Sequence, residues 1–219
     1  QFDVGIMYRN GRGVPKNDAE AVKWYRKAAE QGHAKAQNNL GQMYRKGDGV
    51  SKNNTEAVKW YRKAAEQGVA DAQYNLGFMY AKGRGVPQDY AVAVRWWRLA
   101  AEQGDASAQY NLGFMYENAR GMTQDHAEAA KWFRLAAEQG FAGAQASLGV
   151  TYLEGLGLPH DDVQALMWFN LAASRFPPGE DHDRAVQDRD TVAKRMTPSQ
   201  IAEAAKLARE WSPRGEQAE

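Results

Sequence analysis

The chain has 219 residues, of which 43% are hydrophobic and 25% are charged, a composition typical of a folded chain rather than a disordered one. Its formal net charge of +1 is too balanced for the broad basic surface of a nucleic-acid-binding protein. Its apolar runs fall short of the roughly 20 residues that cross a bilayer. The absence of cysteine excludes disulfides, thiolate catalysis and cysteine-ligated zinc, and it leaves the redox compartment open. We therefore expect neither a nucleic-acid partner nor membrane insertion.

A repeat of constant length runs along most of the chain. The segment AVKWYRKAAEQG at Ala21–Gly32 recurs letter for letter at Ala57–Gly68, 36 residues later. The same spacing relates three further series: Trp24, Trp60, Trp96, Trp132 and Trp168; Gly5, Gly41, Gly77, Gly113 and Gly149; Tyr8, Tyr44, Tyr80, Tyr116 and Tyr152. A fixed period of this size predicts a solenoid, in which each repeat buries its apolar face only against its neighbours.

The first repeat is incomplete at its start. Gln1 aligns with Gln37, and the alanine that precedes Gln37 in the repeat has no counterpart before Gln1. We therefore expect that an upstream part, with room for a signal peptide, is missing from this sequence.

Each repeat begins with a predicted amphipathic helix, of which Ala36–Arg45 is an example. At about 100° per residue its apolar residues fall on one face. They are Ala36, Leu40, Met43 and Tyr44. Gly41 borders this face, and a glycine inside a helix costs about 1 kcal/mol relative to alanine. Its return in every repeat predicts that the backbone of a neighbouring helix approaches closely.

The second predicted helix of a repeat, for example Ala19–Gln31, also has one apolar side. That side holds Ala21, Trp24 and Ala28 and is widened by Tyr25 and Ala29. A glycine follows each of these helices, where a C-cap glycine belongs. The glycines are Gly32, Gly68, Gly104 and Gly140.

A glycine-rich loop joins the two helices of each repeat. Examples are Gly11–Pro15, Gly47–Ser51, Gly83–Pro87 and Gly155–Pro159. Two glycines could cradle a phosphate, but no G-K-[S/T] follows them, and their recurrence favours turns that need a positive φ. Ala119 replaces the first loop glycine of the fourth repeat, so the conformation of that loop is the one in doubt.

The array ends near residue 176. The fifth repeat reads Ala172–Phe176 in place of AAEQG, and Pro177–Gly179 then interrupts the chain. Two further helices are predicted, one over Asp181–Met196 and one that begins at the N-cap Thr197, with Pro198 at the first helical position and Gln200 completing a capping box. Their apolar residues are Ala185, Val192 and Met196 in the first, and Ile201, Ala204, Ala208 and Trp211 in the second. We interpret them as a C-terminal cap, followed by a frayed polar tail at Ser212–Glu219.

The repeated pattern A-x-A-Q-x-x-L-G-x-x-Y…G-x-G-V…(D/N)…A-x-x-W-x-x-x-A-A-x-Q-G resembles the Sel-like repeat (SLR) family, a relative of the tetratricopeptide repeats. The resemblance covers about Gln1–Ala173 and returns in register five times. It implies an all-α fold, a right-handed α/α superhelical solenoid of about five helix pairs with C-terminal capping helices. The repeats are expected at about 1–32, 33–68, 69–104, 105–140 and 141–176, and the cap and polar tail at 177–219.

No catalytic or metal-binding constellation emerges from the sequence. The histidines, His33, His126, His160 and His182, occupy different positions of the repeat and form no close ligand pair. Ser147 lies in Q-A-S-L-G, which lacks the first glycine of a nucleophile elbow. The β-lactam chemistry linked to some cysteine-rich members of the family would need S-x-x-K, which does not occur. We expect no enzyme activity, no metal and no cofactor, and a hydrolase is the least favoured reading.

A basic series follows the second helices. It comprises Lys23, Arg26, Lys27, Lys59, Arg62, Lys63, Arg95 and Arg98, with Glu30, Glu66, Glu102 and Glu138 close behind. We interpret it as a solvated outer face with local ion pairs, and an anionic partner is the less favoured alternative.

In tetratricopeptide-like superhelices the first helices line a concave groove. The resemblance therefore places the candidate binding site on the side of these helices that lies opposite their buried residues, which we call the outward face. The candidates are Phe2, Ile6, Lys35, Asn38, Asn39, Gln42, Arg45, Tyr74, Asn75, Phe78, Lys82, Tyr110, Asn111, Phe114, Glu117 and Val150. Tyr74 with Phe78, and Tyr110 with Phe114, recur in register and could form an exposed aromatic surface. The alternative is that these rings pack on neighbouring helices or on the cap.

Two further features of this face leave alternatives open. Basic residues such as Arg45, Lys46 and Lys82 lie toward its N-terminal half, and Glu117 and Glu154 toward its C-terminal half. The resemblance implies that an asparagine here can bond the backbone of a bound peptide, and the alternative is a hydrogen bond between helices. The asparagines concerned are Asn39, Asn75 and Asn111.

We therefore expect a monomeric, non-catalytic scaffold or adaptor that binds a protein or peptide segment. The resemblance implies bacterial envelope signalling or assembly and favours the periplasm or secretion, with the cytoplasm left open. The alternative is a scaffold that binds an envelope glycan, such as peptidoglycan or exopolysaccharide, because stacked aromatic rings also suit sugars.

Overall fold

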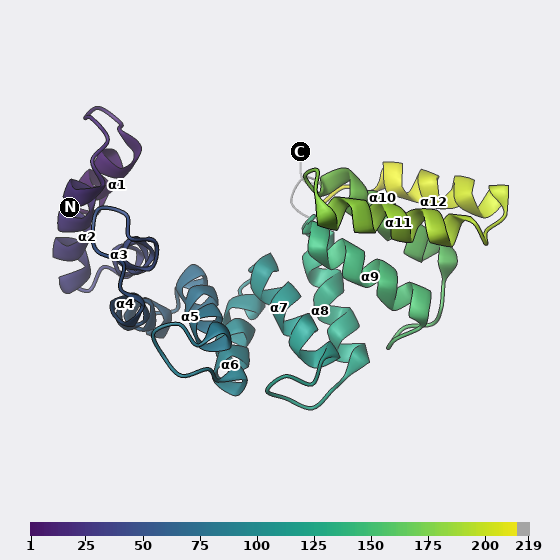
Figure 1. Cartoon of the computed structure of the whole chain (residues 1–219), viewed down its shortest axis with the longest axis horizontal. Coiled ribbons are helices and arrows are strands. Elements are labelled where there is room, and N and C mark those ends of the chain that lie inside the picture. Colours follow the sequence, from purple (N-terminus) through teal and green to yellow (C-terminus); the bar gives the residue numbers. More distant parts are fainter. Residues whose placement is uncertain (214–219) are drawn as a thin grey trace. The chain divides into compact units, whose positions relative to one another are not determined.

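The computed structural model describes residues 1–213, which form twelve α-helices and no strand (Figure 1). The helices are α1 (Phe2–Asn10), α2 (Asp18–Glu30), α3 (Ala34–Lys46), α4 (Asn54–Glu66), α5 (Ala70–Lys82), α6 (Tyr90–Glu102), α7 (Ala106–Glu117), α8 (His126–Glu138), α9 (Ala142–Glu154), α10 (Asp162–Arg175), α11 (Glu180–Ala193) and α12 (Pro198–Glu210). Helices α1 to α10 are the first and second helices of five repeats in turn. The all-α expectation is therefore confirmed over the described residues.

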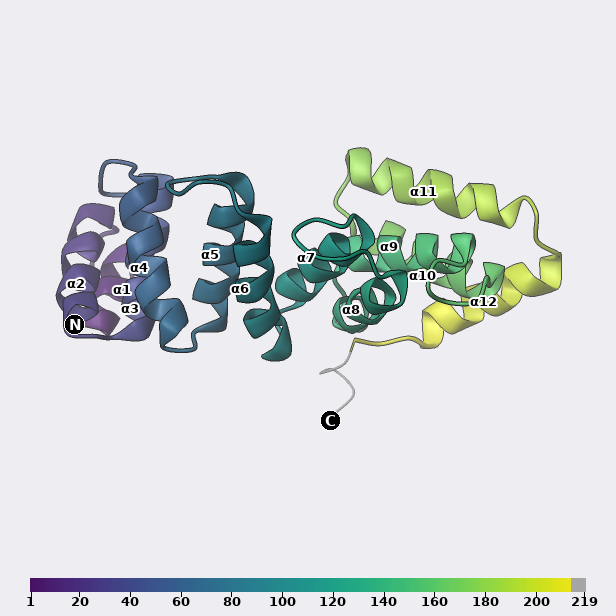
Figure 2. The same ribbon diagram turned by 90° about the horizontal axis from the view of Figure 1, so that it is seen from below.

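The chain divides into two compact units. Unit 1 is Gln1–Asp105 with α1 to α6, and unit 2 is Ala106–Glu219 with α7 to α12. Within each unit the two helices of a repeat pack on each other, and the second helix also packs on the first helix of the next repeat. In unit 2, α11 and α12 both pack on α10, the last second helix (Figure 2). The division falls between the third and fourth repeats, whereas the sequence pattern changes near residue 176.

A side-chain cap begins every second helix. The caps are Asn17, Asn53, Asp89, Asp125 and Asp161, and each accepts a hydrogen bond from the backbone N–H three residues later. Such a cap satisfies an N–H that the helix leaves without a partner and stabilises the helix by about 1 kcal/mol. At the other end of α2, Gly32 has φ +89°, its N–H donates to Ala29, and the N–H of His33 donates to Ala28. This is a Schellman motif, so the predicted C-cap glycine is confirmed here.

The second glycine of the loop is needed because another helix lies against it. A Cβ on Gly49 would come within 2.2 Å of the backbone of Asp18, and a Cβ on Gly85 within 2.4 Å of the backbone of Asn54. The loop therefore rests on the start of the preceding repeat's second helix. Ala119, which replaces the first loop glycine of the fourth repeat, has φ 54° and so keeps the left-handed conformation despite the strain.

The glycine inside each first helix receives a flat aromatic ring. A Cβ would lie 2.6 Å from the ring of Tyr25 at Gly5, and 2.8 Å from the ring of Tyr61 at Gly41. The same contact joins Gly77 to Trp97, Gly113 to Phe133 and Gly149 to Phe169. The predicted close approach of a neighbouring helix is therefore confirmed, and the partner is the residue that follows the repeated tryptophan.

Three of the five repeated tryptophans are less buried than the sequence pattern suggested. Trp24, Trp96 and Trp132 are partly exposed, whereas the residues that follow them are buried. Trp60 and Trp168 are themselves buried, each with 6% of its surface exposed.

Glutamine side chains join the two helices of a repeat and also link consecutive repeats. The side-chain amide of Gln67 donates to that of Gln37 (2.7 Å), and Gln37 donates in turn to the carbonyl of Ala29 (3.0 Å). The same side-chain pair recurs as Gln31 with Gln1, Gln103 with Gln73, and Gln139 with Gln109. In the fifth repeat Arg175 stands where the donor glutamine would be, and Oε1 of Gln145 has no hydrogen-bond partner among the described residues. The series ends where the array ends.

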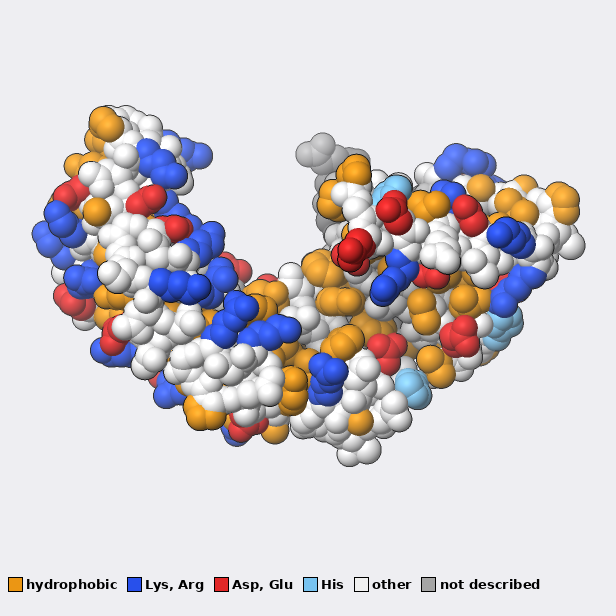
Figure 3. All heavy atoms as spheres, in the orientation of Figure 1, with side chains coloured by type: hydrophobic (Ala, Val, Ile, Leu, Met, Phe, Trp, Pro, Cys, Tyr) orange, Lys and Arg blue, Asp and Glu red, His pale blue; other side chains and the backbone are white. Residues whose placement is uncertain are grey.

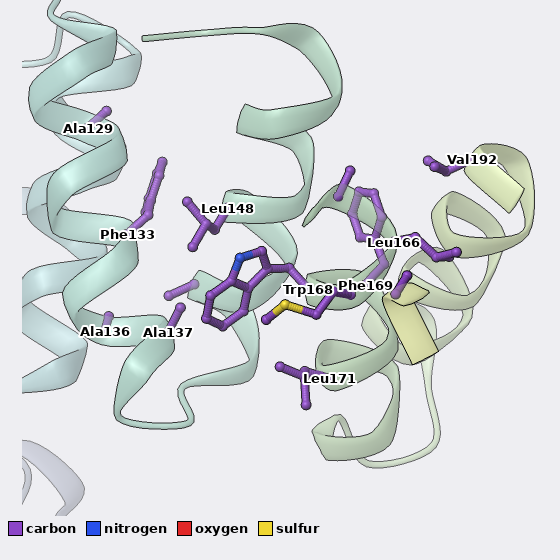
Figure 4. Packing of buried hydrophobic residues seen from close by; sticks show 14 residues of the cluster. Ala129, Phe133, Ala136, Ala137, Leu148, Leu166, Trp168, Phe169, Leu171 and Val192 are labelled. Atoms are coloured by element: carbon purple, nitrogen blue, oxygen red, sulfur yellow. The ribbon is translucent and has the colours of Figure 1, made fainter. Parts of the chain in front are cut away.

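The core of unit 2 joins the last repeats to the cap helices. Figure 4 shows Phe133 and Leu148 from facing helices, with Trp168 and Phe169 beyond them and Val192 of α11 at the far side. The predicted capping box at Thr197 is confirmed, because its hydroxyl accepts from the N–H of Gln200 while the Gln200 side chain accepts from the N–H of Thr197. The cap therefore covers α10, as a solenoid end requires.

One residue of the predicted apolar side of α12 is placed differently. Ile201 is exposed, whereas Ala204, Ala208 and Trp211 pack on the core of unit 2. Helix α12 thus contacts the core through its later turns and not through its first. The expected polar tail lies mostly outside the described residues.

Replacing Gly41 by alanine should destabilise the fold although alanine favours helices. The gain in helix propensity is about 1 kcal/mol, and overpacking against a ring and the Ala57 carbonyl (3.2 Å) costs up to about 3 kcal/mol. We expect the free energy of unfolding in urea, followed by far-UV circular dichroism, to fall by about 2 kcal/mol. The loss should shrink in a Tyr61→Leu background, and an equal loss in both backgrounds would contradict the ring contact.

Candidate functional site

The candidate residues at the start of unit 1 form an aromatic pair. Phe2 stacks on His33 with ring centroids 4.5 Å apart, and it also contacts Tyr25 at 5.8 Å. Ile6 is half-buried beside them, and Lys35 is exposed. The candidates Phe2 and Ile6 therefore belong partly to the scaffold, because both pack against the core of the first repeats.

The asparagines of unit 1 bond within the scaffold. The side-chain amide of Asn75 donates to Oδ1 of Asn38 (3.3 Å), and Asn38 is only 4% exposed. Asn39 hydrogen-bonds the Tyr25 hydroxyl. The helix-to-helix alternative that the sequence left open is thus realised for these residues, while Asn111 in unit 2 and Gln42 in unit 1 are half-buried.

The aromatic candidates are half-buried, and an arginine lies close to the ring of each of the two phenylalanines. The Arg84 guanidinium lies 5.4 Å from the ring centroid of Phe78, and Arg120 lies at the same distance from Phe114. In unit 1 the backbone carbonyl of Tyr74 accepts a hydrogen bond from the Trp97 indole (3.1 Å). Neither arginine was predicted to lie at the site, although both occupy the same position of the glycine loop.

The charged side chains on the outer face of the second helices bond to other residues of the scaffold. Arg26, Arg62 and Arg134 each donate to the hydroxyl of a tyrosine 18 residues later, at 2.8, 2.5 and 2.6 Å. The lysines pair locally, as Lys23 does with Glu20 at 2.6 Å. Ion pairs of this kind are confirmed, and three of them use Glu20, Glu56 and Glu128, which precede their lysines in the helix.

Unit 2 contains a cleft of about 510 Å³ between α7, α9 and α11. Its apolar lining includes Tyr110 of α7, Phe141 before α9, Val150 of α9 and Phe176 before α11. The Tyr110 ring packs against Phe141, with centroids 5.1 Å apart, and against the buried Phe133 at 5.9 Å. We call this feature the unit 2 cleft. Its rings are half-buried, so they belong to the scaffold on one side and to the cleft on the other.

Charged side chains of α11 complete the unit 2 cleft. They are Asp181, Arg184 and Asp188. Burial raises the pKa of the Asp188 carboxyl, and the nearby Arg184 opposes that shift. Burial also raises the pKa of the Tyr110 hydroxyl, against a hydrogen bond from Ser147. The cleft thus combines apolar walls with a carboxyl that is incompletely solvated.

The cap's contribution to this cleft was not predicted. Phe141 occupies the N-cap position that holds His33, Val69 and Asp105 in other repeats, so a large apolar residue there was a detectable departure. Phe176 follows the altered end of the fifth repeat, where the sequence also departs from the pattern. Asp181 and Asp188 could not be assigned to the cleft from sequence, because the docking of α11 depends on tertiary packing.

The charged candidates at the ends of the first helices differ between the units. In unit 1, Arg45 is half-buried and its Nε donates to the Tyr61 hydroxyl (3.2 Å), and Lys82 is exposed. In unit 2, burial raises the pKa of Glu117, against a hydrogen bond from Asn118. The carboxyl at the end of α7 therefore lacks full hydration.

Residues 1–213 hold no group of three or more histidine, aspartate and glutamate side chains placed to bind a metal ion. None of the twelve helices there has the length and apolarity to span a bilayer.

The fold and the repeated contacts define an α-helical solenoid scaffold, and comparisons place it in a family. The family model of the Sel1 repeat matches five consecutive segments, residues 1–33, 34–69, 70–105, 106–141 and 142–175. The chain therefore belongs to the Sel1 repeat family. Proteins of this family are generally non-catalytic scaffolds for protein interactions.

Solved structures agree with this assignment. A Sel1 repeat protein from Oxalobacter formigenes is 37% identical with a TM-score of 0.80, over 94% of this chain and 83% of that one. A protective antigen of uropathogenic Escherichia coli with an SLR fold is 30% identical with a TM-score of 0.53, over 96% of this chain and 60% of that one. An immunity protein from Pseudomonas aeruginosa shares the fold at 22% identity and a TM-score of 0.50, over 96% of this chain and 84% of that one. The comparison with curated proteins gave no match.

The raised pKa of Glu117 predicts a pH-dependent stability. The folded state holds the proton more tightly than the unfolded state, whose pKa is near 4.5. The associated stability is therefore full below that value and is lost as the pH rises through the folded-state pKa. Glu117→Gln should raise the Tm above this interval and should leave it unchanged in acid, as measured by thermal melts across the pH range.

The matched control for this experiment is Glu154→Gln, which changes an exposed carboxyl at the end of α9. It should leave the Tm nearly unchanged at every pH. An equal rise in Tm for both variants would show that net charge, and not the burial of Glu117, is responsible.

Proposed function

We propose that this protein is a non-catalytic scaffold that binds a segment of another protein, with the unit 2 cleft as its docking site for apolar side chains. The observation that carries the proposal is the cleft itself, an open volume of about 510 Å³ walled by half-buried aromatic residues. Exposed apolar surface of this kind marks interaction sites, and aromatic residues dominate binding energies.

The repeats provide an internal comparison that supports this proposal. The scaffold contacts use the same residue types in each repeat, such as the helix glycine and the N-cap Asn or Asp. The position of Tyr110, in contrast, holds Phe2, Asn38, Tyr74 or Ala146 elsewhere. Since the same fold forms with a polar or a small residue there, packing does not demand an aromatic ring at this position.

The charges of the cleft indicate the chemistry of the bound segment. Asp188 is half-buried and Asp181 exposed, and Arg184 is the cation that lines the cleft with them. A partner cation beside Asp188 would restore part of the interaction that burial removes from its carboxylate. The segment that fits is an apolar side chain with a neighbouring lysine or arginine.

The remaining candidates would extend the contact. Tyr74 and Phe78 in unit 1, and Phe114 in unit 2, offer additional half-buried rings to a partner. The relatives described above come from bacteria, which is consistent with an adaptor role in bacterial envelope signalling or assembly.

A displayed library of random peptides tests this function. Clones selected on the wild-type protein should be enriched in apolar residues next to lysine or arginine, and they should lose binding to Ala142→Trp. Ala142 is the half-buried first residue of α9 and lines the cleft, so an indole there would occupy the space of the ligand. We expect affinity to fall by more than tenfold, as for the loss of an interface hot spot of about 2 kcal/mol.

The matched control is Ala70→Trp. Ala70 is the half-buried first residue of α5, so the same substitution is made at the same position of another repeat. The selected clones should bind this variant as tightly as the wild type. Selection of no clones above background, or equal binding to Ala142→Trp, would refute the cleft as the docking site.

A further inference from the structure

A second concave surface, in unit 1, is lined by cations. Arg45 and Lys46 lie in the last turn of α3, Lys52 precedes α4, Asn54 begins α4, and Arg84 follows α5. They enclose about 370 Å³, and none of these lining residues is acidic. We call this feature the basic pocket. Figure 3 shows that Lys and Arg side chains gather along one side of this unit.

The positive charges of the basic pocket are not neutralised within the described chain. Arg45, Lys46, Lys52 and Arg84 form no ion pair with a carboxylate of residues 1–213. The helix dipole favours Arg45 and Lys46 at the end of α3, but it gives no reason for Lys52 or Arg84. The four positive charges around the basic pocket repel one another, and a bound anion would relieve this repulsion.

The corresponding positions of other repeats show that the scaffold does not need this charge. Between the first and second repeats the set contains two carboxylates, and Lys16 pairs with Asp18 at 3.9 Å. That set is Arg9, Asn10, Lys16, Asp18 and Asp48. Within unit 2 the set is Glu117, Asn118, Gln124, His126 and Leu156. The same helix pairs therefore form with balanced, acidic or neutral residues in these places.

We propose that the basic pocket binds the carboxylates of an acidic segment of a protein partner. The inference rests on the proposed scaffold function and specifies a second partner chemistry, at a surface separate from the unit 2 cleft. Arg84 is suited to this role, because its guanidinium lies 5.4 Å from the Phe78 ring and the ring supports it without using its N–H donors. Lys46 and Lys52 are exposed and supply point charges.

A protein segment fits the pocket better than a nucleic acid does. Nucleic acids need a basic surface that follows many phosphates, whereas the whole chain has a net charge of +1 and the pocket holds four cations. Four neighbouring carboxylates would neutralise the four positive charges of such a pocket. Arginine pairs well with a carboxylate because its two parallel N–H donors match the two oxygens.

The test uses a fluorescein-labelled oligoglutamate peptide and fluorescence anisotropy at low salt. The variant Lys46→Asn with Lys52→Gln carries residues that other repeats have at these positions, Asn10 and Gln88 among them, so the fold should be retained. We expect its affinity for oligoglutamate to be about tenfold lower, with a shallower dependence on salt concentration. Thermal melts verify that both proteins are folded.

The matched control is Lys59→Gln with Lys63→Gln, which removes the same charge from exposed positions of α4 in the same unit. Its affinity should change less than twofold. An equal loss in the two double variants would overturn the inference, since general charge would then explain binding. Single-stranded oligothymidylate of matched charge and inorganic phosphate serve as competing probes, and tighter, pocket-dependent binding of either would overturn the choice of carboxylates.

The experiments can refute the unit 2 cleft and the basic pocket independently of each other. Ala142→Trp should leave oligoglutamate binding unchanged, because Ala142 lies in unit 2 and the basic pocket in unit 1. Absence of oligoglutamate binding, while library peptides still select the unit 2 cleft, would overturn only the basic pocket. Absence of both would also overturn the proposed function.

Discussion

The contact between a helix glycine and an aromatic ring underlies the whole architecture. At Gly41 and Tyr61, and at the four equivalent pairs, the ring occupies the space where any larger residue would carry its Cβ. This contact holds the two helices of a repeat together at short range. Glutamine pairs such as Gln37 with Gln67, and arginine–tyrosine bonds such as Arg26 with Tyr44, are added to it. These contacts use the interior of the solenoid and the outer face of the second helices. The residues on the outward face of the first helices can therefore vary from repeat to repeat.

The sequence predicted the helices and the close approach of neighbouring helices, and it did not predict which polar side chains bond one another. Period and composition were sufficient for the helix pairs, the C-cap glycine Gly32, the capping box at Thr197 and the close approach at Gly41. The asparagines could not be resolved, because Asn75 has two possible partners and only the structure shows that it bonds Asn38. The deeper burial of Tyr25 relative to Trp24 also depends on how two helices cross.

The candidate site shows the same division. Tyr110, Phe114 and Val150 were identifiable as apolar residues on an outward face, because the helical period assigns them to it. Phe176, Asp181 and Asp188 were not, because their place in the unit 2 cleft depends on how α11 packs on α10. The basic pocket lay between these cases: Arg45 and Lys46 were noted as charges, but Lys52 and Arg84 join them only through the turns of two loops.

We propose that the outward face of the first helices binds partner proteins, whereas the second helices serve as scaffold. An amide ¹H–¹⁵N NMR titration with a peptide selected on the wild-type protein tests it most directly. We expect the shifted resonances to belong to α7, α9 and the facing turns of α11, around Tyr110, Ala146 and Asp188. Shifts confined to the outer face of the second helices, around Lys131 and Arg134, would contradict it.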